Sequence, residues 1–83
     1  MLHCVVVTPE KAEIDQEADF VVLPMVDGEL GVQKNHTPLI GRVGSGELRL
    51  TVAGLVQKFR ISGGFAQVRA NVITVLTTKV ERV

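Results

Sequence analysis

The clearest pattern of hydrophobic and polar positions lies in the middle of the chain, where the two kinds of residue alternate. In Glu47–Val52 every second residue is apolar, and in Leu55–Ile61 the side chains again divide between a more apolar and a more polar face. A period of two is the spacing of a half-buried β-strand. Ala53 and Gly54 separate the two runs, and glycine supplies the positive φ that a tight turn requires. The sequence therefore predicts a β-hairpin over this stretch.

Shorter apolar segments flank this hairpin, and glycine or proline residues separate them, as is typical of a β-sandwich or barrel. A tight turn is expected at Ala70-Asn71, and Ser62-Gly63-Gly64 is expected to form a bulge or a strand crossing. Helical spacing never persists over the length of an amphipathic helix. We therefore expect an all-β domain of two packed antiparallel sheets. The predicted strands outside the hairpin are Leu2–Thr8, Lys11–Gln16, Ala18–Leu23, Phe65–Arg69 and Val72–Leu76, with a polar turn at Asp15-Gln16-Glu17.

Three of these strands have apolar residues on both faces, namely Leu2–Thr8, Ala18–Leu23 and Val72–Leu76. A strand of a two-layer sandwich normally hides one face and leaves the other in water. A domain of this size has little material to cover a sheet twice, so we expect a partner protein to cover one outer face. Val22 and Val75 are placed on that outer face.

The composition excludes several classes of protein. The chain has 83 residues, 46% of them hydrophobic, which is enough for a single domain over residues 1–83. Nine basic residues balance nine acidic ones, which disfavours nucleic acid or an anionic membrane as the main partner. No apolar run approaches the ~20 residues that span a bilayer, and the first residues do not resemble a signal peptide. A single cysteine, Cys4, allows no internal disulfide, and we expect a soluble, cytosolic protein.

The residues that could carry chemistry do not form a known catalytic or metal-binding pattern. His3 and Cys4 lack further ligands at a metal-binding spacing. Ser62-Gly63-Gly64 lacks the lysine and the following helix of a phosphate-binding loop. A hydrolase that uses His36 with Glu29 is an alternative without a recognisable nucleophile–base pair. We therefore expect no enzyme, no metal and no cofactor. A second alternative, stronger than the hydrolase, is a free-standing sandwich that binds a small ligand.

Several segments, in the same order and spacing, resemble the N-terminal domain of the F-type ATP synthase epsilon subunit. Each segment is weak alone, but as a set they are specific and cover nearly the whole chain. They are Val5–Glu10, Val21–Pro24, Asp27–Val32, His36–Leu39, Gly46–Arg49, Ser62–Phe65 and Asn71–Leu76.

This resemblance implies a fold and a function. The fold would be a flattened antiparallel β-sandwich of about ten strands in two sheets. The protein would be a non-catalytic subunit of the central stalk, or rotor, in the F1 part of a proton-translocating ATP synthase. It would bind the gamma subunit and contact the c-ring of Fo without entering the bilayer, and so help couple proton flow to ATP synthesis. It would lie peripherally on the cytoplasmic face of the bacterial plasma membrane.

The resemblance also assigns interface roles to five residues. Asp27, Glu29 and Leu30 match the acidic loop that faces the c-ring, and Thr8 and His36 match positions near gamma. These residues would act through desolvated packing and charge-assisted hydrogen bonds. In the absence of gamma, the uncovered apolar face is expected to favour a homodimer.

Two features depart from the family pattern. Lys34-Asn35 stands before the histidine where the family usually has Pro-Gly, and asparagine is the next best residue for a left-handed backbone. The helical hairpin that forms the second domain of the family is not found after Val83, so its inhibitory arm and its ATP-sensing site are not assigned here.

Overall fold

The computed structural model describes all 83 residues, and its regular elements are strands without a helix. This confirms the all-β class predicted from the alternating pattern. The strands are β1 (Leu2–Val7), β2 (Ala12–Ala18), β3 (Phe20–Met25), β4 (Gly28–Val32), β5 (Leu39–Val52), β6 (Leu55–Arg69), β7 (Val72–Leu76) and β8 (Val80–Arg82).

The strands form one continuous hydrogen-bonded path in the order β2-β1-β7-β6-β5-β3-β4, and β8 pairs with β6 beside this path. All neighbours are antiparallel except β1 and β7, which run parallel. The expected detail of about ten strands in two separate sheets is therefore not confirmed, because eight strands share one bent sheet.

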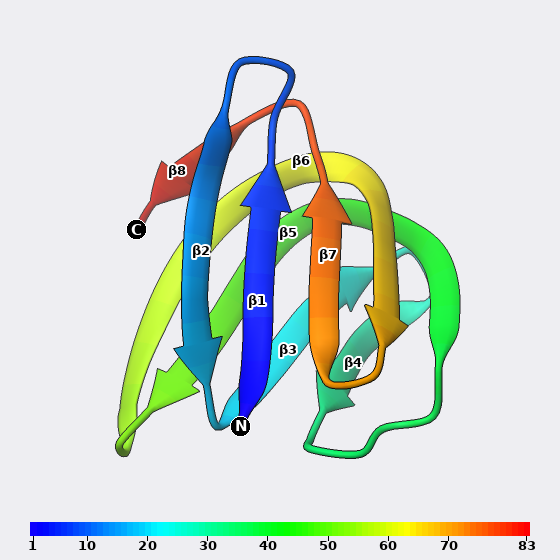
Figure 1. The fold of residues 1–83 in the computed structure, drawn as a ribbon. Coiled ribbons are helices and arrows are strands. Elements are labelled where there is room, and N and C mark those ends of the chain that lie inside the picture. Colours follow the sequence, from blue (N-terminus) through cyan, green and yellow to red (C-terminus); the bar gives the residue numbers. More distant parts are fainter.

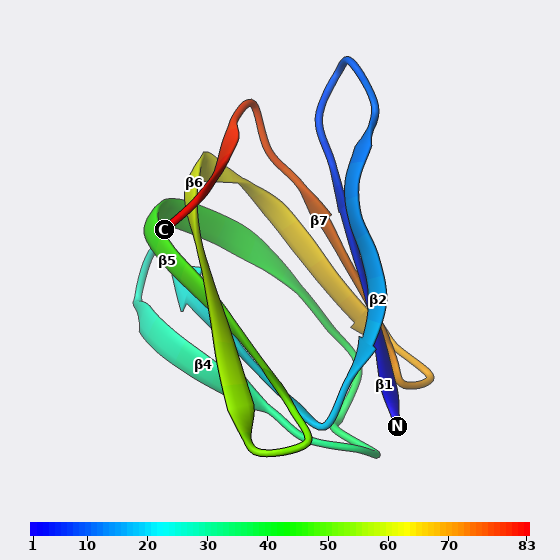
Figure 2. The same ribbon diagram turned by 90° about the vertical axis from the view of Figure 1, so that its left-hand side faces the viewer.

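The bend that folds this sheet into two layers lies in the long strands β5 and β6. Val43 pairs with Gly64, but the next pair along is Ser45 with Ser62, so the ladder skips one residue on each strand. Gly63 and Gly64 have φ of +74° and +128°, a backbone that residues with a Cβ rarely adopt. Figures 1 and 2 show the result: β1, β2 and β7 lie in one layer, β3 and β4 in the other, and β5 and β6 curve between them.

The core lies between the two layers and contains 17 buried hydrophobic residues. The alternating residues identified in the sequence contribute to this core. Leu48 and Leu50 of β5 are fully buried, and Phe59 of β6, which pairs with Leu48, is nearly so. Glu47 and Arg49 project from the opposite face of β5. The predicted division of these two strands into a core face and a polar face is confirmed.

Both predicted tight turns are confirmed. Ala53 and Gly54 have φ of +52° and +80°, and Ala70 and Asn71 have φ of +51° and +65°. Two positive values in a two-residue loop match the right-handed twist of the strands that they join.

Three parts of the predicted strand pattern are wrong, because strand pairing rather than local residue type decides where these strands run. Asp15-Gln16-Glu17 is the middle of β2 and pairs with β1. Ser62-Gly63-Gly64 bends β6 without ending it. No strand was predicted over Val80–Arg82, but these residues pair with Phe59–Ile61 as β8, and the guanidinium of Arg82 lies 5.0 Å from the centroid of the Phe59 ring.

Pro24 does not end β3 as the sequence suggested. The strand continues to Met25, and Pro24 pairs with Glu29 of β4. On the other side, the register of β3 with β5 shifts between Val22 and Met25, because proline has no N–H to donate to a ladder.

Candidate functional site

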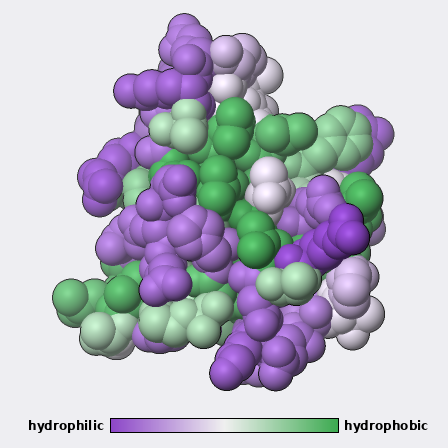
Figure 3. Space-filling model, viewed as in Figure 1, coloured by the Kyte–Doolittle hydropathy of each residue, from purple (hydrophilic) through white to green (hydrophobic).

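One outer sheet face, formed by β1, β7, β6 and the start of β5, is largely apolar. Val7 pairs with Leu76, and Leu76 pairs with Phe65, so these side chains form one row across three strands. The exposed fractions of Leu76 and Phe65 are 53% and 54%. Figure 3 shows hydrophobic side chains gathered in the middle of this face, with hydrophilic ones on both sides. We call this surface the apolar face, and its residues are Val5, Val7, Ile40, Phe65, Val72 and Leu76.

The expectation of strands with two apolar sides is confirmed for β1 and β7, but neither of the two residues placed together on one outer face, Val22 and Val75, lies on the apolar face. Val75 is fully buried, and its neighbour Leu76 points outward together with Val72. Val22 of β3 is half-buried and belongs to the outer side of the other layer. When both sides of a strand are apolar, alternation alone does not reveal which side faces the core.

Charged residues of opposite sign flank the apolar face. Asp15 and Glu17 of β2 lie on its acidic edge, where Asp15 pairs with the Nε2 atom of His3. Arg42 of β5 and Arg69 of β6 lie on its basic edge. Because β7 is the middle of the five strands β2-β1-β7-β6-β5, the apolar face has one charge sign on each side.

Thr8 lies at the end of the apolar face where β1 and β7 finish. It is 7% exposed, and its Oγ1 is 3.2 Å from both the carbonyl oxygen of Lys11 and Oε2 of Glu13. The N–H of Lys11 also donates to Oγ1 at 3.4 Å. The hydroxyl therefore stabilises the β1–β2 loop, and little of Thr8 is open to a partner.

His36 lies at the opposite end of this layer, next to the turn that precedes β7. Asn35 adopts φ of +66°, the left-handed backbone expected from the sequence. Its N–H donates to Oδ1 of Asn71 at 2.6 Å, and the Asn71 amide donates back at 3.4 Å. Nδ1 of His36 is 2.7 Å from the carbonyl oxygen of Thr37, which leaves Nε2 without a protein partner. The two asparagines thus hold the histidine loop against the β6–β7 turn.

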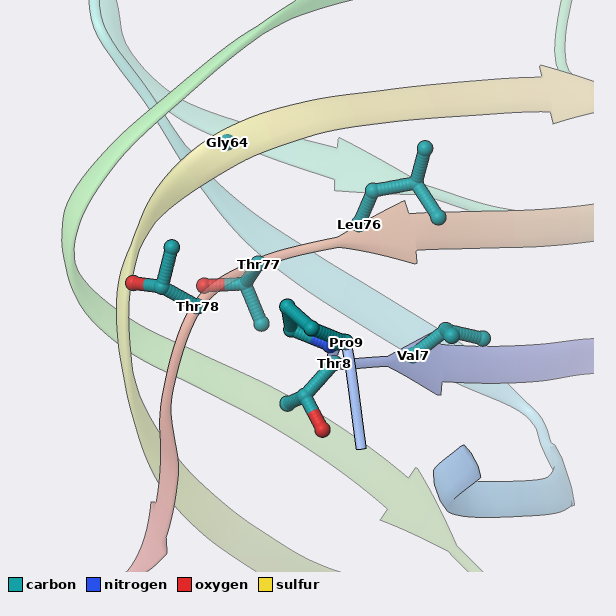
Figure 4. A pocket seen from close by; sticks show the side chains of 7 residues that line it. All are labelled: Val7, Thr8, Pro9, Gly64, Leu76, Thr77 and Thr78. Carbon is teal, nitrogen blue, oxygen red and sulfur yellow. The ribbon is translucent and has the colours of Figure 1, made fainter. Parts of the chain in front are cut away.

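A pocket of about 390 Å³ adjoins the apolar face near Thr8 (Figure 4). Oγ1 of Thr77 accepts from the N–H of Ser62, and Oγ1 of Thr78 donates to the carbonyl oxygen of Ser62, both at 3.3 Å. Because these hydroxyls have internal partners, the pocket presents mainly methyl groups and is suited to an apolar side chain rather than to a polar ligand. Its lining residues are Val7, Thr8, Pro9, Gly64, Leu76, Thr77 and Thr78.

The second candidate surface is the β3–β4 hairpin, which carries Asp27, Glu29 and Leu30. Asp27 is exposed in the turn, whereas Leu30 is half-buried and packs against the core. Oε1 and Oε2 of Glu29 each accept from one nitrogen of the Arg49 guanidinium at 3.0 Å. This bidentate hydrogen bond and the positive charge lower the pKa of Glu29 below its usual value. The three residues thus lie on one hairpin, but their side chains have different surroundings.

The geometry provides no support for the hydrolase alternative. The carboxylate of Glu29 is held by Arg49, and the His36 ring contacts the carbonyl oxygen of Thr37, so no hydrogen bond joins the two candidates. No three His, Cys, Asp or Glu side chains cluster as a metal site would require. Burial raises the pKa of Cys4 to about 12, which keeps its thiol protonated and unreactive at neutral pH.

Sequence reasoning missed two residues, Arg49 and Asn71, that hold the candidate surfaces in place. Arg49 is 20 residues from Glu29, and Asn71 is 36 residues from Asn35. Neither pair has a local sequence signal, since only the strand order brings its members together. For Arg49 alone, the alternation in β5 indicated that its side chain lies on the outer face, but it did not indicate its partner.

Comparison with known proteins identifies relatives along the whole chain. Residues 1–83 match the family described as ATP synthase, Delta/Epsilon chain, beta-sandwich domain. The ATP synthase epsilon chain of Rhodopirellula baltica is 57% identical over 76 residues, which are 92% of this chain and 59% of that protein. The epsilon chain of Carboxydothermus hydrogenoformans is 46% identical over 77 residues, with coverage of 93% and 58%. The chain therefore spans less than two thirds of these relatives.

Two solved structures share the fold. A chain of the Euglena gracilis mitochondrial ATP synthase, in a structure of OSCP, F1 and the c-ring, superposes with a TM-score of 0.91 at 23% identity, covering 98% of this chain and 52% of that one. A chain from the central stalk and c-ring of the Tetrahymena thermophila mitochondrial enzyme gives a TM-score of 0.76 at 17% identity, with coverage of 95% and 64%. At these identities the likeness concerns the fold alone.

Proposed function

This chain belongs to the beta-sandwich family of ATP synthase delta/epsilon chains, and from that membership we propose that it is a non-catalytic rotor subunit of a proton-translocating ATP synthase. In this role it binds the gamma subunit in the central stalk and contacts the c-ring. It thereby helps couple proton flow to ATP synthesis at catalytic sites on other subunits. The names of the relatives support this proposal, since those that match over most of this chain are epsilon chains.

The observation that carries the proposal is the apolar face, which we assign to gamma. Contiguous apolar surface of this kind marks a protein interface more often than a solvated surface. Thr8 and His36 lie at opposite ends of the face, so a single partner near both residues would cover β1 and β7 between them. The apolar pocket beside Thr8 continues the same surface through Val7 and Leu76.

The c-ring contact is assigned to the β3–β4 hairpin with Asp27, Glu29 and Leu30. This hairpin belongs to the other layer (Figure 1), away from the centre of the apolar face, so gamma and the c-ring could bind at the same time. Leu30 would support the hairpin from the core side, and the acidic part of the hairpin would provide its polar contacts.

In this proposal the chain lies at the cytoplasmic face of a bacterial plasma membrane. The structure has no long apolar helix able to cross a membrane. Attachment in the proposed assembly would be peripheral, through gamma and the c-ring.

Co-purification with a gamma subunit, ideally from the same genome, tests the proposed function. We expect size exclusion with light scattering to show a 1:1 complex, and the isolated chain to hydrolyse no ATP. A chain that elutes apart from a folded gamma subunit would contradict the proposal and would favour the alternative of a free-standing ligand-binding sandwich.

A further inference from the structure

The β3–β4 hairpin has an interrupted connection to the rest of its layer. The register of β3 with β5 shifts between Val22 and Met25, and Pro24, within this interval, has no N–H to donate. Pro24 also packs closely over Gly46, where an added Cβ would lie 2.9 Å from the Cβ of the proline. Over this interval, backbone pairing alone holds the hairpin to β5 less firmly than along the rest of β3.

Arg49 spans this interruption. It projects from β5 opposite Val22, reaches over β3 and binds both carboxylate oxygens of Glu29 on β4 at 3.0 Å. Its side chain is 30% exposed, and its guanidinium is 3.5 Å from Oε1 of Glu47, which lies two residues away on the same strand. A bidentate guanidinium–carboxylate pair restricts both side chains to one mutual orientation. The pair therefore connects the edge strand β4 directly to β5.

The pair also determines which carboxylate of the hairpin is free. Each oxygen of Glu29 already accepts a charge-assisted hydrogen bond, and Arg49 compensates its charge. Asp27, two residues earlier in the turn, is exposed and takes part in none of the ion pairs. A partner that reaches the hairpin would meet one uncompensated carboxylate, that of Asp27.

We propose that Arg49 is a positioning residue, which together with Glu29 fixes the β3–β4 hairpin so that Asp27 can bind a cationic or N–H donor group on a polar loop of the c-ring. This inference rests on the proposed function for its partner. It divides the two acidic residues into a structural one, Glu29, and a contacting one, Asp27.

Exchanging the two charges separates positioning from direct contact. The double variant Glu29→Arg with Arg49→Glu restores an ion pair across β3 but removes the carboxylate from position 29. It is best made in a Glu47→Gln background, because Glu47 would repel a carboxylate at position 49. The controls are Glu47→Gln alone, each single charge reversal in that background, and Glu81→Gln, which removes an exposed carboxylate from β8 on the same layer.

Binding of the chain–gamma complex to detergent-solubilised c-ring gives the first readout. We expect the affinity of the charge-exchanged variant to lie within about twofold of that of Glu47→Gln. Each single reversal should bind about tenfold more weakly than Glu47→Gln, and Asp27→Asn about tenfold more weakly than the unmodified chain. The loss of one charge-assisted hydrogen bond accounts for a change of this size. Glu81→Gln should bind as the unmodified chain does. Weak binding by the charge-exchanged variant together with normal binding by Asp27→Asn would overturn the inference and make Glu29 the contact.

A second readout needs no c-ring. Amide hydrogen exchange in the isolated chain should be faster in residues 28–32 of Arg49→Met, slow again in the charge-exchanged variant, and unchanged at the β6–β7 turn. If the unmodified complex fails to bind the c-ring, the proposed function is contradicted, and the assignment of Asp27 falls with it. If exchange at residues 28–32 does not respond to Arg49→Met, the positioning role is wrong, whatever the c-ring result.

Discussion

The backbone of Gly64 passes so close to Leu76 that a methyl group at position 64 would overlap the carbonyl oxygen of Leu76 and lie 2.9 Å from its carbonyl carbon. Gly64 also has φ of +128°, which side-chain-bearing residues rarely adopt. This contact lies where β6 bends between the two layers, so the bend depends on a residue without a Cβ.

The substitution Gly64→Ala should therefore destabilise the domain severely. Strain from the backbone and the overlap together should lower the free energy of unfolding by on the order of 3 kcal/mol or more. Gly54→Ala is the matched control, because Gly54 has φ of +80° but open space around the Cβ position, and strain alone costs about 1–2 kcal/mol. Urea unfolding followed by circular dichroism measures both. Equal losses in the two variants would show that the contact with Leu76 contributes nothing.

The ion pair between Glu29 and Arg49 predicts a pH dependence. The pKa of Glu29 is lower in the folded chain than in the unfolded chain. The pair therefore stabilises the fold at a pH above the pKa that Glu29 has in the unfolded chain. This contribution is lost as the pH falls through the pKa that Glu29 has in the folded chain. The effect on stability is small because the pair is exposed. An NMR titration of the Glu29 carboxyl should give a midpoint below 4.5, and Arg49→Met should raise it. Arg69→Met, which removes an arginine from the other layer, should leave it unchanged; a midpoint insensitive to Arg49 would contradict the pair.

The buried thiol of Cys4 predicts the opposite dependence at alkaline pH. The folded pKa of about 12 lies above the reference value of 9.0. The unfolded chain therefore releases this proton first, and stability should fall as the pH rises from about 9 toward 12. Unfolding measured across this range should show a loss that Cys4→Ala lacks. A disulfide reagent should modify the native chain slowly at neutral pH, and rapid modification without unfolding would contradict the burial.

Local sequence patterns predicted most of the backbone but little of the two candidate surfaces. The alternation in β5 and β6 identified the core side of Leu48, Leu50 and Phe59, because one face of each strand is polar. The turns at Ala53-Gly54 and Ala70-Asn71 were predictable because few residues tolerate a positive φ. These features depend on neighbours in the sequence.

Features that depend on strand pairing, or on which side of a strand is buried, were missed. The polar residues of β2 suggested a turn, although pairing with β1 makes them an edge strand. Val75 was placed outward because both sides of β7 are apolar. The contact of Arg49 with Glu29 requires β3 to lie between β5 and β4, and no local pattern specifies that order. The same holds for the Asn35–Asn71 pair beside His36.

The isolated chain should form a dimer through the apolar face. A two-fold axis parallel to β7 would place the acidic edge of one copy, with Asp15 and Glu17, over the basic edge of the other, with Arg42 and Arg69. Leu76 would then meet its own counterpart, as expected for an isologous contact. Sedimentation equilibrium should show a dimer that added salt weakens, since exposed charges are screened. A monomer at millimolar concentration and low salt would contradict this expectation, as would a dimer indifferent to Leu76→Asp.

The central claim, that gamma binds the apolar face, is tested most directly by comparing two aspartate substitutions. Leu76 of β7 and Val56 of β6 are 53% and 52% exposed but lie on the outer sides of different layers. Both variants should keep the circular dichroism and thermal unfolding of a folded chain. Calorimetric titration with gamma should show that Leu76→Asp loses at least about tenfold in affinity, as for a buried interface residue, whereas Val56→Asp binds normally. Unchanged affinity of folded Leu76→Asp would contradict the account.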